Sequence, residues 1–378
     1  MRVLVAPDGF TGTLTASQAA RAMARGWSAA RPGDEVELCP LSDGGPGFVE
    51  VLASVLGGRL LHVGASGPLG DPVRAPVLLV DAGGQRTAYV ESALACGSAL
   101  VPADRRDALA ASTTGVGELL AAALEAGARR VVVGLGGSGT TDGGAGVLAA
   151  LGAGDPDRLG RGGGALAGVE AGDLAGLRDV RARWADVDLV AASDVDVPLL
   201  GPRGAARGFG PQKGAGPAQV EALEAALADL VRAAEGALGP AARALAERPG
   251  SGAAGGLGYA LALLGGRREG GARAVAGAVR LPERARGAGA LLTGEGSLDW
   301  QSLHGKVVAE VARCGGEAGV PVVAVAGQVR LEPEQARAAG LAAAAAVAER
   351  PEDVPAALAD PAGTLAARVR RLAAGWGA

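Results

Sequence analysis

The stretch Gly134-Leu-Gly-Gly-Ser-Gly-Thr-Thr-Asp-Gly-Gly-Ala-Gly146 is the most informative part of this 378-residue chain. It follows Arg129-Arg-Val-Val-Val133, which is typical of a short buried strand, and leads into Val147-Leu-Ala-Ala-Leu151, which is typical of a helix. A glycine-rich turn between a strand and a helix presents backbone N–H groups and the positive end of the helix dipole, with room for close approach. The stretch therefore predicts an anion-binding loop in an α/β protein.

The sequence on both sides continues this alternation of strands and helices. Thr15-Ala-Ser-Gln18 predicts the capped start of a helix that runs to Ala30. Between residues 60 and 91, by contrast, short strands are joined by Gly-Pro turns without a long helix. Residues 154–182 are rich in glycine and weakly patterned, and we expect a surface loop there. The expected strands lie at residues 3–6, 35–41, 60–63, 73–80, 86–91, 129–133, 188–192, 290–293, 322–326 and 341–347.

These patterns predict two α/β domains. A discontinuous parallel-sheet domain of the Rossmann or flavodoxin type would comprise residues 1–64 and 289–378. An inserted α/β domain, residues 65–288, would carry the glycine-rich phosphate loop. We expect a cleft between the two domains to hold a small-molecule ligand.

Composition narrows the class of protein. Apolar residues make up 49% of the chain, aromatic residues only 2%, and the formal charge is −4, which gives no reason to expect nucleic acid or a membrane surface as partner. No apolar run is suited to span a bilayer, and the N-terminus does not resemble a signal peptide. The three cysteines, Cys39, Cys96 and Cys314, show no metal-ligand spacing, so we expect a cytoplasmic protein.

Lysine is almost absent. Of 36 basic residues only Lys213 and Lys306 are lysines, and each stands beside glycine. Because almost every other basic residue of this chain is arginine, an arbitrary surface role is a weak explanation for these two lysines, and they are candidates for contact with an anion.

Two other nucleotide-binding motifs fit poorly. Gly134-Leu-Gly-Gly-Ser-Gly139 matches the dinucleotide pattern G-x-G-x-x-G, but a second strand and a ribose-binding acid should follow about twenty residues later, and they do not. Gly305-Lys306 lacks the upstream glycine of a Walker A motif.

Acidic residues follow nearly every predicted strand. Each one alone is explained as a helix cap or a turn former. Together they supply what phosphoryl transfer to a hydroxyl needs, namely a proton acceptor and oxygen ligands for Mg²⁺, beside the N–H groups and lysines that would bind phosphate oxygens. Only two histidines are present, His62 and His304, so any metal should have oxygen ligands. The acidic candidates are Asp8, Asp43, Asp142, Asp194, Asp196, Glu295 and Asp299.

Taken in order, these stretches resemble the motifs of the bacterial type I glycerate kinase family over nearly the whole chain. The resemblance is carried by Ala6–Asp8, Gly12–Ala16, Leu41–Gly45, Ser66–Gly70, Thr114–Glu118, Gly136–Gly146, Ser193–Asp196, Gly201–Gly204, Phe209–Gly214, Ala253–Gly258, Thr293–Gly296 and Leu303–Lys306.

The resemblance implies ATP- and Mg²⁺-dependent phosphorylation of a hydroxyl of D-glycerate or a closely related small hydroxy acid. We expect Asp194, Lys213 and Lys306 to be catalytic, with Asp194 as the proton acceptor, and Asp194, Asp196 and Glu295 to be metal ligands. The sequence leaves open which hydroxyl reacts. It also leaves open the oligomeric state, for which a homodimer is one alternative. The residues expected to bind substrate or phosphate are Asp8, Asp43, Gly44, Gly136, Gly137, Ser138, Thr140, Asp142, Gly143, Gly144, Asp196, Gly255, Gly256, Glu295 and His304.

Four loops depart from the family pattern. Gly9 and Thr11 replace serine and lysine, Pro46 replaces glutamate, Val197 replaces asparagine and Ser297 replaces arginine. These changes motivate an alternative, a catalytically weakened relative that binds nucleotide or an anionic ligand without turnover. An NAD-linked oxidoreductase is the third hypothesis.

Overall fold

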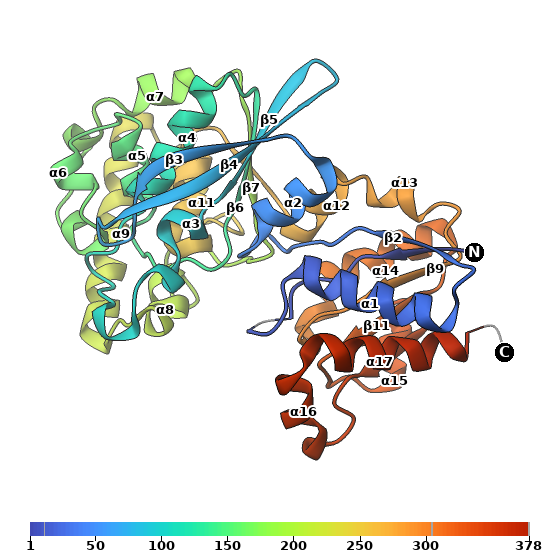
Figure 1. The fold of residues 1–378 in the computed structure, drawn as a ribbon. Coiled ribbons are helices and arrows are strands. Elements are labelled where there is room, and N and C mark those ends of the chain that lie inside the picture. The colour runs from blue at the N-terminus through green and yellow to red at the C-terminus, as the bar shows by residue number, and fades with distance from the viewer. Residues whose placement is uncertain (11, 304, 377–378) are drawn as a thin grey trace. The chain divides into compact units, whose positions relative to one another are not determined.

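The computed structural model describes residues 1–10, 12–303 and 305–376. The chain forms two compact units (Figure 1). The first comprises residues 1–43, 50–57 and 270–378, and the second comprises residues 44–49 and 58–269. Both contain parallel strands covered by helices, so the expected α/β class is confirmed.

The first unit is built on a five-stranded sheet in the order β13-β11-β9-β1-β2. Every neighbouring pair in it is parallel. Read in chain order this is the 2-1-3-4-5 arrangement of flavodoxin-like folds, in which ligands bind at the carboxyl ends of the strands. The strands are β1 (Arg2–Val5), β2 (Glu35–Leu38), β9 (Ala290–Thr293), β11 (Val322–Ala326) and β13 (Ala343–Ala346), with a separate parallel pair of β10 (Ser297–Leu298) and β12 (Gln328–Val329).

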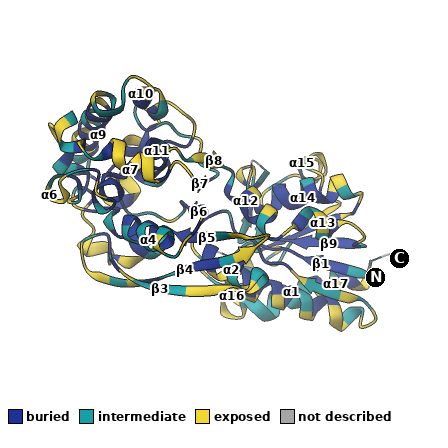
Figure 2. Cartoon of the chain, turned by 90° about the horizontal axis from the view of Figure 1, so that it is seen from above, coloured by how far each residue is buried: buried dark blue, intermediate teal, exposed yellow. Residues whose placement is uncertain are grey.

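Helices cover this sheet and bury its apolar residues, as the dark blue strands β1 and β9 in Figure 2 show. Helix α1 has the expected capping box, in which Thr15 and Gln18 bond each other's backbone N–H groups. It packs against α17, and a Cβ on Gly26 would stand 2.2 Å from the Ala366 carbonyl, so only glycine allows this approach. The helices are α1 (Ala16–Ala30), α2 (Phe48–Leu56), α12 (Gly271–Ala278), α13 (Leu281–Ala285), α14 (Val307–Ala318), α15 (Pro333–Ala338), α16 (Val354–Ala359) and α17 (Pro361–Ala374).

The second unit is built on a six-stranded sheet in the order β3-β4-β5-β6-β7-β8. The first three strands are antiparallel, and β5 to β8 run parallel. Its strands are β3 (Arg59–Ser66), β4 (Pro72–Ala82), β5 (Gln85–Glu91), β6 (Arg130–Gly134), β7 (Asp188–Ala192) and β8 (Arg267–Glu269). Its helices are α3 (Ala93–Cys96), α4 (Thr114–Glu125), α5 (Ala145–Ala150), α6 (Pro156–Leu159), α7 (Leu177–Arg183), α8 (Ala205–Phe209), α9 (Pro217–Leu238), α10 (Ala241–Ala246) and α11 (Ala253–Leu263).

The expectation of a surface loop at residues 154–182 is wrong. This region contains α6, two short 3-10 turns and the start of α7, and it contributes fully buried side chains to the core of the second unit. Leu159, Leu166, Leu174 and Leu177 are each 0% exposed. One-turn helices separated by glycine leave no regular apolar period, which is why the sequence pattern did not reveal them.

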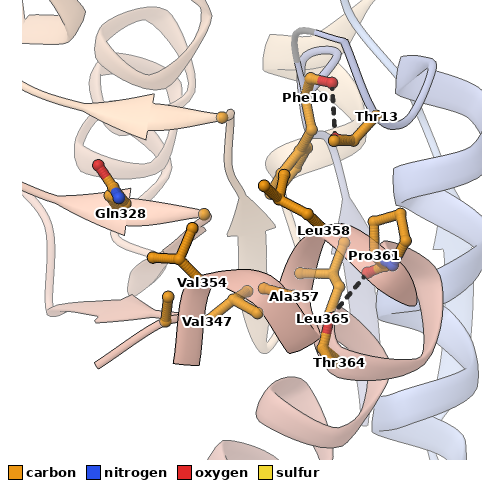
Figure 3. Close-up of a pocket in the computed structure, with 13 residues that line it drawn as sticks. Phe10, Thr13, Gln328, Val347, Val354, Ala357, Leu358, Pro361, Thr364 and Leu365 are labelled. Atoms are coloured by element: carbon orange, nitrogen blue, oxygen red, sulfur yellow. Dashed lines mark hydrogen bonds between the residues drawn. The ribbon is translucent and has the colours of Figure 1, made fainter. Parts of the chain in front are cut away.

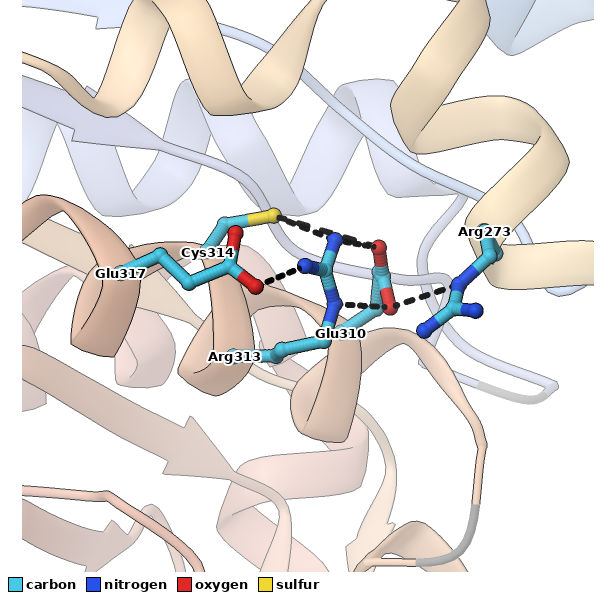
Figure 4. A network of polar contacts seen from close by, with 5 residues as sticks. All are labelled: Arg273, Glu310, Arg313, Cys314 and Glu317. Carbon is cyan, nitrogen blue, oxygen red and sulfur yellow. Dashed lines mark hydrogen bonds and ion pairs between the residues drawn. The ribbon is translucent and has the colours of Figure 1, made fainter.

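The boundaries of the units also differ from the expected ones at residues 64 and 289. Strand β3 belongs wholly to the second unit because it pairs residue for residue with β4. Helices α12 and α13 belong to the first unit because they pack against α14. There Arg273 of α12 lies 3.8 Å from the buried carboxylate of Glu310, which also binds Arg313 (Figure 4).

Among the helices that the structure describes, none combines the length and the apolar character that crossing a membrane would require.

Candidate active site

Lys213 is a buried cation in the second unit. It ends a 3-10 turn, Pro211–Lys213, and only 5% of it is exposed. Its ammonium donates hydrogen bonds to the Ser138 hydroxyl at 3.0 Å and to the Thr140 carbonyl at 2.6 Å. Both acceptors are neutral, and burial lowers the pKa of Lys213 to about 8. A charge that is buried against neutral acceptors can be stabilised by an added anion.

A cavity of about 320 Å³ opens beside this lysine. Its walls come from the carboxyl ends of β6 and β7, from the turn that carries Lys213 and from the start of α11. The lining residues are Ser98, Leu135, Gly136, Gly137, Ser138, Val195, Phe209, Gln212, Lys213 and Ala254. The structure therefore brings Gly136, Gly137, Ser138 and Lys213 together at one cavity.

The second half of the glycine-rich stretch does not face this cavity. Asp142 is 0% exposed, and its carboxylate accepts hydrogen bonds from the Thr113 N–H and hydroxyl, both at 2.8 Å, and from the N–H groups of Gly144 and Gly146. Burial raises the pKa of Asp142 above its ordinary value, although these hydrogen bonds act to lower it. The N–H groups at the start of α5 thus bind the protein's own carboxylate, which corrects the expectation that Asp142, Gly143 and Gly144 contact a ligand.

The remaining glycines of the stretch interlock with the second glycine cluster. A Cβ on Gly255 would stand 1.9 Å from the Thr140 carbonyl, and a Cβ on Gly256 would stand 2.5 Å from the Cα of Gly143. The Gly143 N–H donates to the Gly255 carbonyl at 2.9 Å. In this structure Thr140, Gly255 and Gly256 are therefore buried packing positions, unlike the ligand contacts that the sequence predicted.

This interlock carries backbone strain at the cavity wall. Ala254 has φ of 51°, a left-handed conformation that residues other than glycine rarely adopt, and it lines the cavity. Strain of this kind costs of order 1 to 3 kcal/mol and gathers at functional sites. The position supports the assignment of this cavity as a site.

The two aspartates after β7 have different surroundings. Asp194 is half-buried and directly precedes Val195, which lines the cavity. The Asp196 side chain is 73% exposed and lies 2.6 Å from the Arg268 guanidinium. Since the Asp196 carboxylate is mostly exposed, whereas Asp194 is half-buried beside a residue that lines the cavity, Asp196 is a weaker candidate than Asp194 for proton transfer or metal binding.

A second group of predicted residues gathers at the carboxyl edge of the first unit's sheet. Asp8 follows β1, Asp43 follows β2, and Glu295 follows β9, while Lys306 caps α14. Burial and the neighbouring Asp43 and Glu295 carboxylates raise the pKa of Asp8 to about 8, against the lowering effects of the Gly9 N–H and Lys306. Burial likewise raises the pKa of Glu295, and one of its carboxylate oxygens is buried without a hydrogen-bond partner among the described residues.

Three of the residues that depart from the family pattern contact the surrounding protein, and the Ser297 hydroxyl is buried without a hydrogen-bond partner among the described residues. Pro46 packs against Gly137, whose Cβ would stand 2.8 Å from the proline ring. The Val197 carbonyl accepts from two glycine N–H groups, and Ser297 pairs with Gln328 in the small sheet. Thr11 and His304 lie outside the described residues.

Sequence reasoning missed Glu91, which is 3% exposed at the end of β5. It accepts hydrogen bonds from the N–H groups of Gly47 at 3.0 Å and Val49 at 3.1 Å, and so holds the loop whose Gly44 carbonyl accepts from Gly136. The signal was present, because Glu91 is one more acid at a strand end. The cavity residues Ser98, Phe209 and Gln212 gave no such signal.

The structure also argues against a dinucleotide site. Residues 135–187, all of them described, contain helices and turns but no strand, so the second strand of that motif is missing.

Comparison with known proteins gives one family. Residues 3–377 match the Glycerate kinase family. Glycerate kinase of Bacillus subtilis (strain 168) is 42% identical over 87% of this chain and 85% of its own, and Glycerate 2-kinase of Escherichia coli (strain K12) is 39% identical over 87% and 86%. A crystal structure assigned to glycerate kinase 2 from Salmonella typhimurium LT2 superimposes with a TM-score of 0.81 at 35% identity, covering 99% of this chain and 97% of that one. This chain belongs to the glycerate kinase family.

Proposed function

We propose that this protein transfers the γ-phosphoryl group of ATP to a hydroxyl of D-glycerate. Membership of the family supports the reaction class, and one observation in the structure carries the assignment of a site. That observation is Lys213, a buried ammonium with neutral partners beside a cavity at the carboxyl ends of parallel strands. Glycerate carries a carboxylate and its product carries a phosphate, so both present an anion that could accept a hydrogen bond from the Lys213 ammonium, whose present hydrogen-bond partners are neutral.

Lys213, with the Ser138 hydroxyl and the Gly137 N–H, is our proposed anion-binding group. Gly137 and Ser138 lie in the more exposed first half of the glycine-rich stretch, where the Gly136 N–H already donates to the Gly44 carbonyl. Asp194, at the end of β7, is our proposed proton acceptor for the attacking hydroxyl, since a carboxylate in hydrogen-bond reach performs this role in kinases.

Mg²⁺ fits the carboxyl edge of the first unit. The described residues contain no cluster of three or more metal-ligand side chains, but Mg²⁺ in kinases is commonly held by one or two carboxylates together with the nucleotide phosphates. Asp8, Asp43 and Glu295 offer oxygen ligands. Burial and, after it, the repulsion from Asp43 and Glu295 raise the pKa of Asp8, and a bound cation would relieve that repulsion. When bound, the ion would neutralise charge on the phosphates. Lys306 would add a second positive charge there.

The 2-hydroxyl is our proposed acceptor, supported by the name of the Escherichia coli relative, Glycerate 2-kinase. The three free, buried cysteines are consistent with our proposal that the protein acts in the cytoplasm.

The decisive experiment measures ADP release by the purified protein with ATP, Mg²⁺ and D-glycerate, with L-glycerate, lactate and tartrate as comparison acceptors. Added enolase reports the product directly, because enolase consumes 2-phosphoglycerate but not 3-phosphoglycerate. We expect D-glycerate-dependent ADP release and immediate enolase turnover. ADP release with another hydroxy acid alone would overturn the substrate, and nucleotide binding without turnover on any acceptor would establish the weakened relative instead.

A further inference from the structure

The first unit contains an apolar pocket of about 160 Å³ that none of the roles above uses. Its walls come from the loops after β1, β9, β11 and β13 and from helices α16 and α17 (Figure 3). Phe10 and Leu365 lie inside it, at 5% and 1% exposed, whereas Leu358 is 62% exposed at its rim. Of the described residues that line it, none carries a charge.

We infer that this pocket binds the adenine ring of the nucleotide. The inference rests on the proposed kinase function, because that function supplies the nucleotide. Adenine is a flat, uncharged heterocycle with hydrogen-bonding edges. Apolar side chains with a few polar groups are what such a ring requires, and here Phe10 offers an aromatic surface while Thr13 and Gln328 offer polar ones.

The position of the pocket in the fold supports a ligand. In a sheet of order 2-1-3-4-5 the crevice lies between the loops after the first and third strands, which here are β1 and β9. Phe10 comes from the first of these loops and Gly296 from the second. The Asp8 N–H donates to the Gly294 carbonyl at 2.9 Å, so the two loops are tied together at this point.

The same loops lead from the pocket to the charged groups that a polyphosphate needs. Phe10 is two residues from Asp8, and Gly296 follows Glu295, whose carbonyl accepts from the Gly327 N–H at 3.1 Å. An adenine in the pocket therefore places its phosphates on the loops that carry the proposed Mg²⁺ ligands. Glycerate is excluded as the occupant because its carboxylate and hydroxyls would be buried here without charged partners.

The test fills the pocket from one helix. Ala357 lines the pocket in α16, and its neighbour Ala356 is exposed and does not. We expect Ala357→Trp to raise the Kd of a fluorescent ribose-labelled ADP, and the KM for ATP, by about tenfold or more, with the KM for D-glycerate unchanged. Ala356→Trp should behave as wild type, and circular dichroism would verify that both variants fold.

A measurement on the wild-type protein is independent of any substitution. Photolysis with an azido-adenine analogue of ATP, followed by peptide mass spectrometry, should label residues 347–365, and excess ATP should prevent the labelling. Unchanged ADP affinity in Ala357→Trp together with labelling elsewhere would overturn the inference. In that case D-glycerate-dependent ADP release would still uphold the proposed function.

The opposite outcome is also distinguishable. Loss of ADP affinity in Ala357→Trp, without any turnover by the wild type, would uphold the nucleotide pocket and refute the kinase function. A second copy of the chain seated on Leu358 would instead appear as a dimer that Leu358→Asp dissociates, with ADP affinity unaffected.

Discussion

Replacing Lys213 by methionine should stabilise the protein and impair its catalysis. The ammonium is 5% exposed, and burial lowers its pKa from 10.5 to about 8. Because one pKa unit corresponds to about 1.4 kcal/mol, holding this charge inside costs the folded state roughly 3 kcal/mol at neutral pH. Lys213→Met removes that cost but leaves the Thr140 carbonyl and the Ser138 hydroxyl without their donor, a penalty of about 1 to 3 kcal/mol. We expect a net gain of roughly 1 kcal/mol in the free energy of unfolding at about pH 7.

The sign of the pH dependence is a sharper test than the size of the gain. The folded protein releases the Lys213 proton near pH 8, whereas the unfolded chain keeps it up to the ordinary value of 10.5. Between these values the unfolded state binds more protons, so the stability of the wild type rises with pH relative to the variant. The advantage of Lys213→Met should therefore shrink and then reverse by about pH 10.

Urea unfolding followed by circular dichroism, at several pH values, measures this difference. Gln212→Met is the matched control, since Gln212 is adjacent, lines the same cavity and is uncharged. In the kinase assay Lys213→Met should lose roughly 100- to 1,000-fold in kcat/KM for D-glycerate, because a buried charged donor is lost. Parallel stability profiles for wild type and Lys213→Met between pH 7 and 10 would refute the reasoning.

Four further predictions concern other parts of the chain. Asp194→Asn should lower kcat by roughly 100-fold or more, whereas Asp196→Asn, at an exposed residue paired with Arg268, should cost less than about tenfold; equal effects would contradict the assignment of the base. In EDTA, the free energy of unfolding of the wild type should fall as pH rises from about 4 to about 8, because the raised pKa of Asp8 lets the folded protein hold a proton that the unfolded chain loses. Asp8→Asn should remove this fall, and an unchanged profile in the variant would count against the raised pKa. Glu310→Ala should reduce the free energy of unfolding by about 2 kcal/mol, because it removes the buried carboxylate that pairs with Arg313 and Arg273. The control Glu317→Ala removes a side chain that is 61% exposed and should cost under about 0.5 kcal/mol; urea unfolding measures both. Gly255→Ala should cost at least about 3 kcal/mol in the same measurement, because its Cβ meets the Thr140 carbonyl, whereas Gly277→Ala, at an exposed position of α12 where a Cβ meets nothing, should stabilise by about 0.5 kcal/mol; a tolerated Gly255→Ala would refute the interlock.

The parts of the fold that the sequence predicted are those with a strong local pattern. The predicted strands at residues 188–192, 290–293 and 322–326 match β7, β9 and β11 residue for residue, because uniform apolar runs between turn formers have few alternatives. The proline start of α9 at Pro217 was equally clear. The observed unit boundaries differ from the expected ones where pairing between strands decides them. Strand β3, for example, belongs to the second unit because it pairs with β4.

The candidate site was only partly predictable for a physical reason. A glycine-rich loop offers N–H groups, but the sequence does not say what accepts from them. Here Asp142 accepts from the N–H groups of Gly144 and Gly146, the Gly44 carbonyl accepts from Gly136, and the Cys96 carbonyl accepts from Gly139. Close packing against neighbouring backbone and side chains accounts for most of the glycines in the stretch. Lys213 became a candidate because lysine is rare in this chain, whereas the raised pKa of Asp8 depends on tertiary neighbours that no local pattern encodes.

The position of β1 has a consequence for how the chain is made. β1 lies inside the sheet of the first unit and pairs with both β2 and β9. The Thr293 hydroxyl at the end of β9 donates to the Ala6 carbonyl, 287 residues away in sequence. A ribosome adding about 5 to 20 residues per second leaves that edge of β1 unpaired for roughly 15 to 60 s. Residues 58–269, which form most of the second unit, emerge in one piece during that wait. The nascent first unit therefore offers an open apolar strand edge to chaperones until β9, Ala290–Thr293, has been translated.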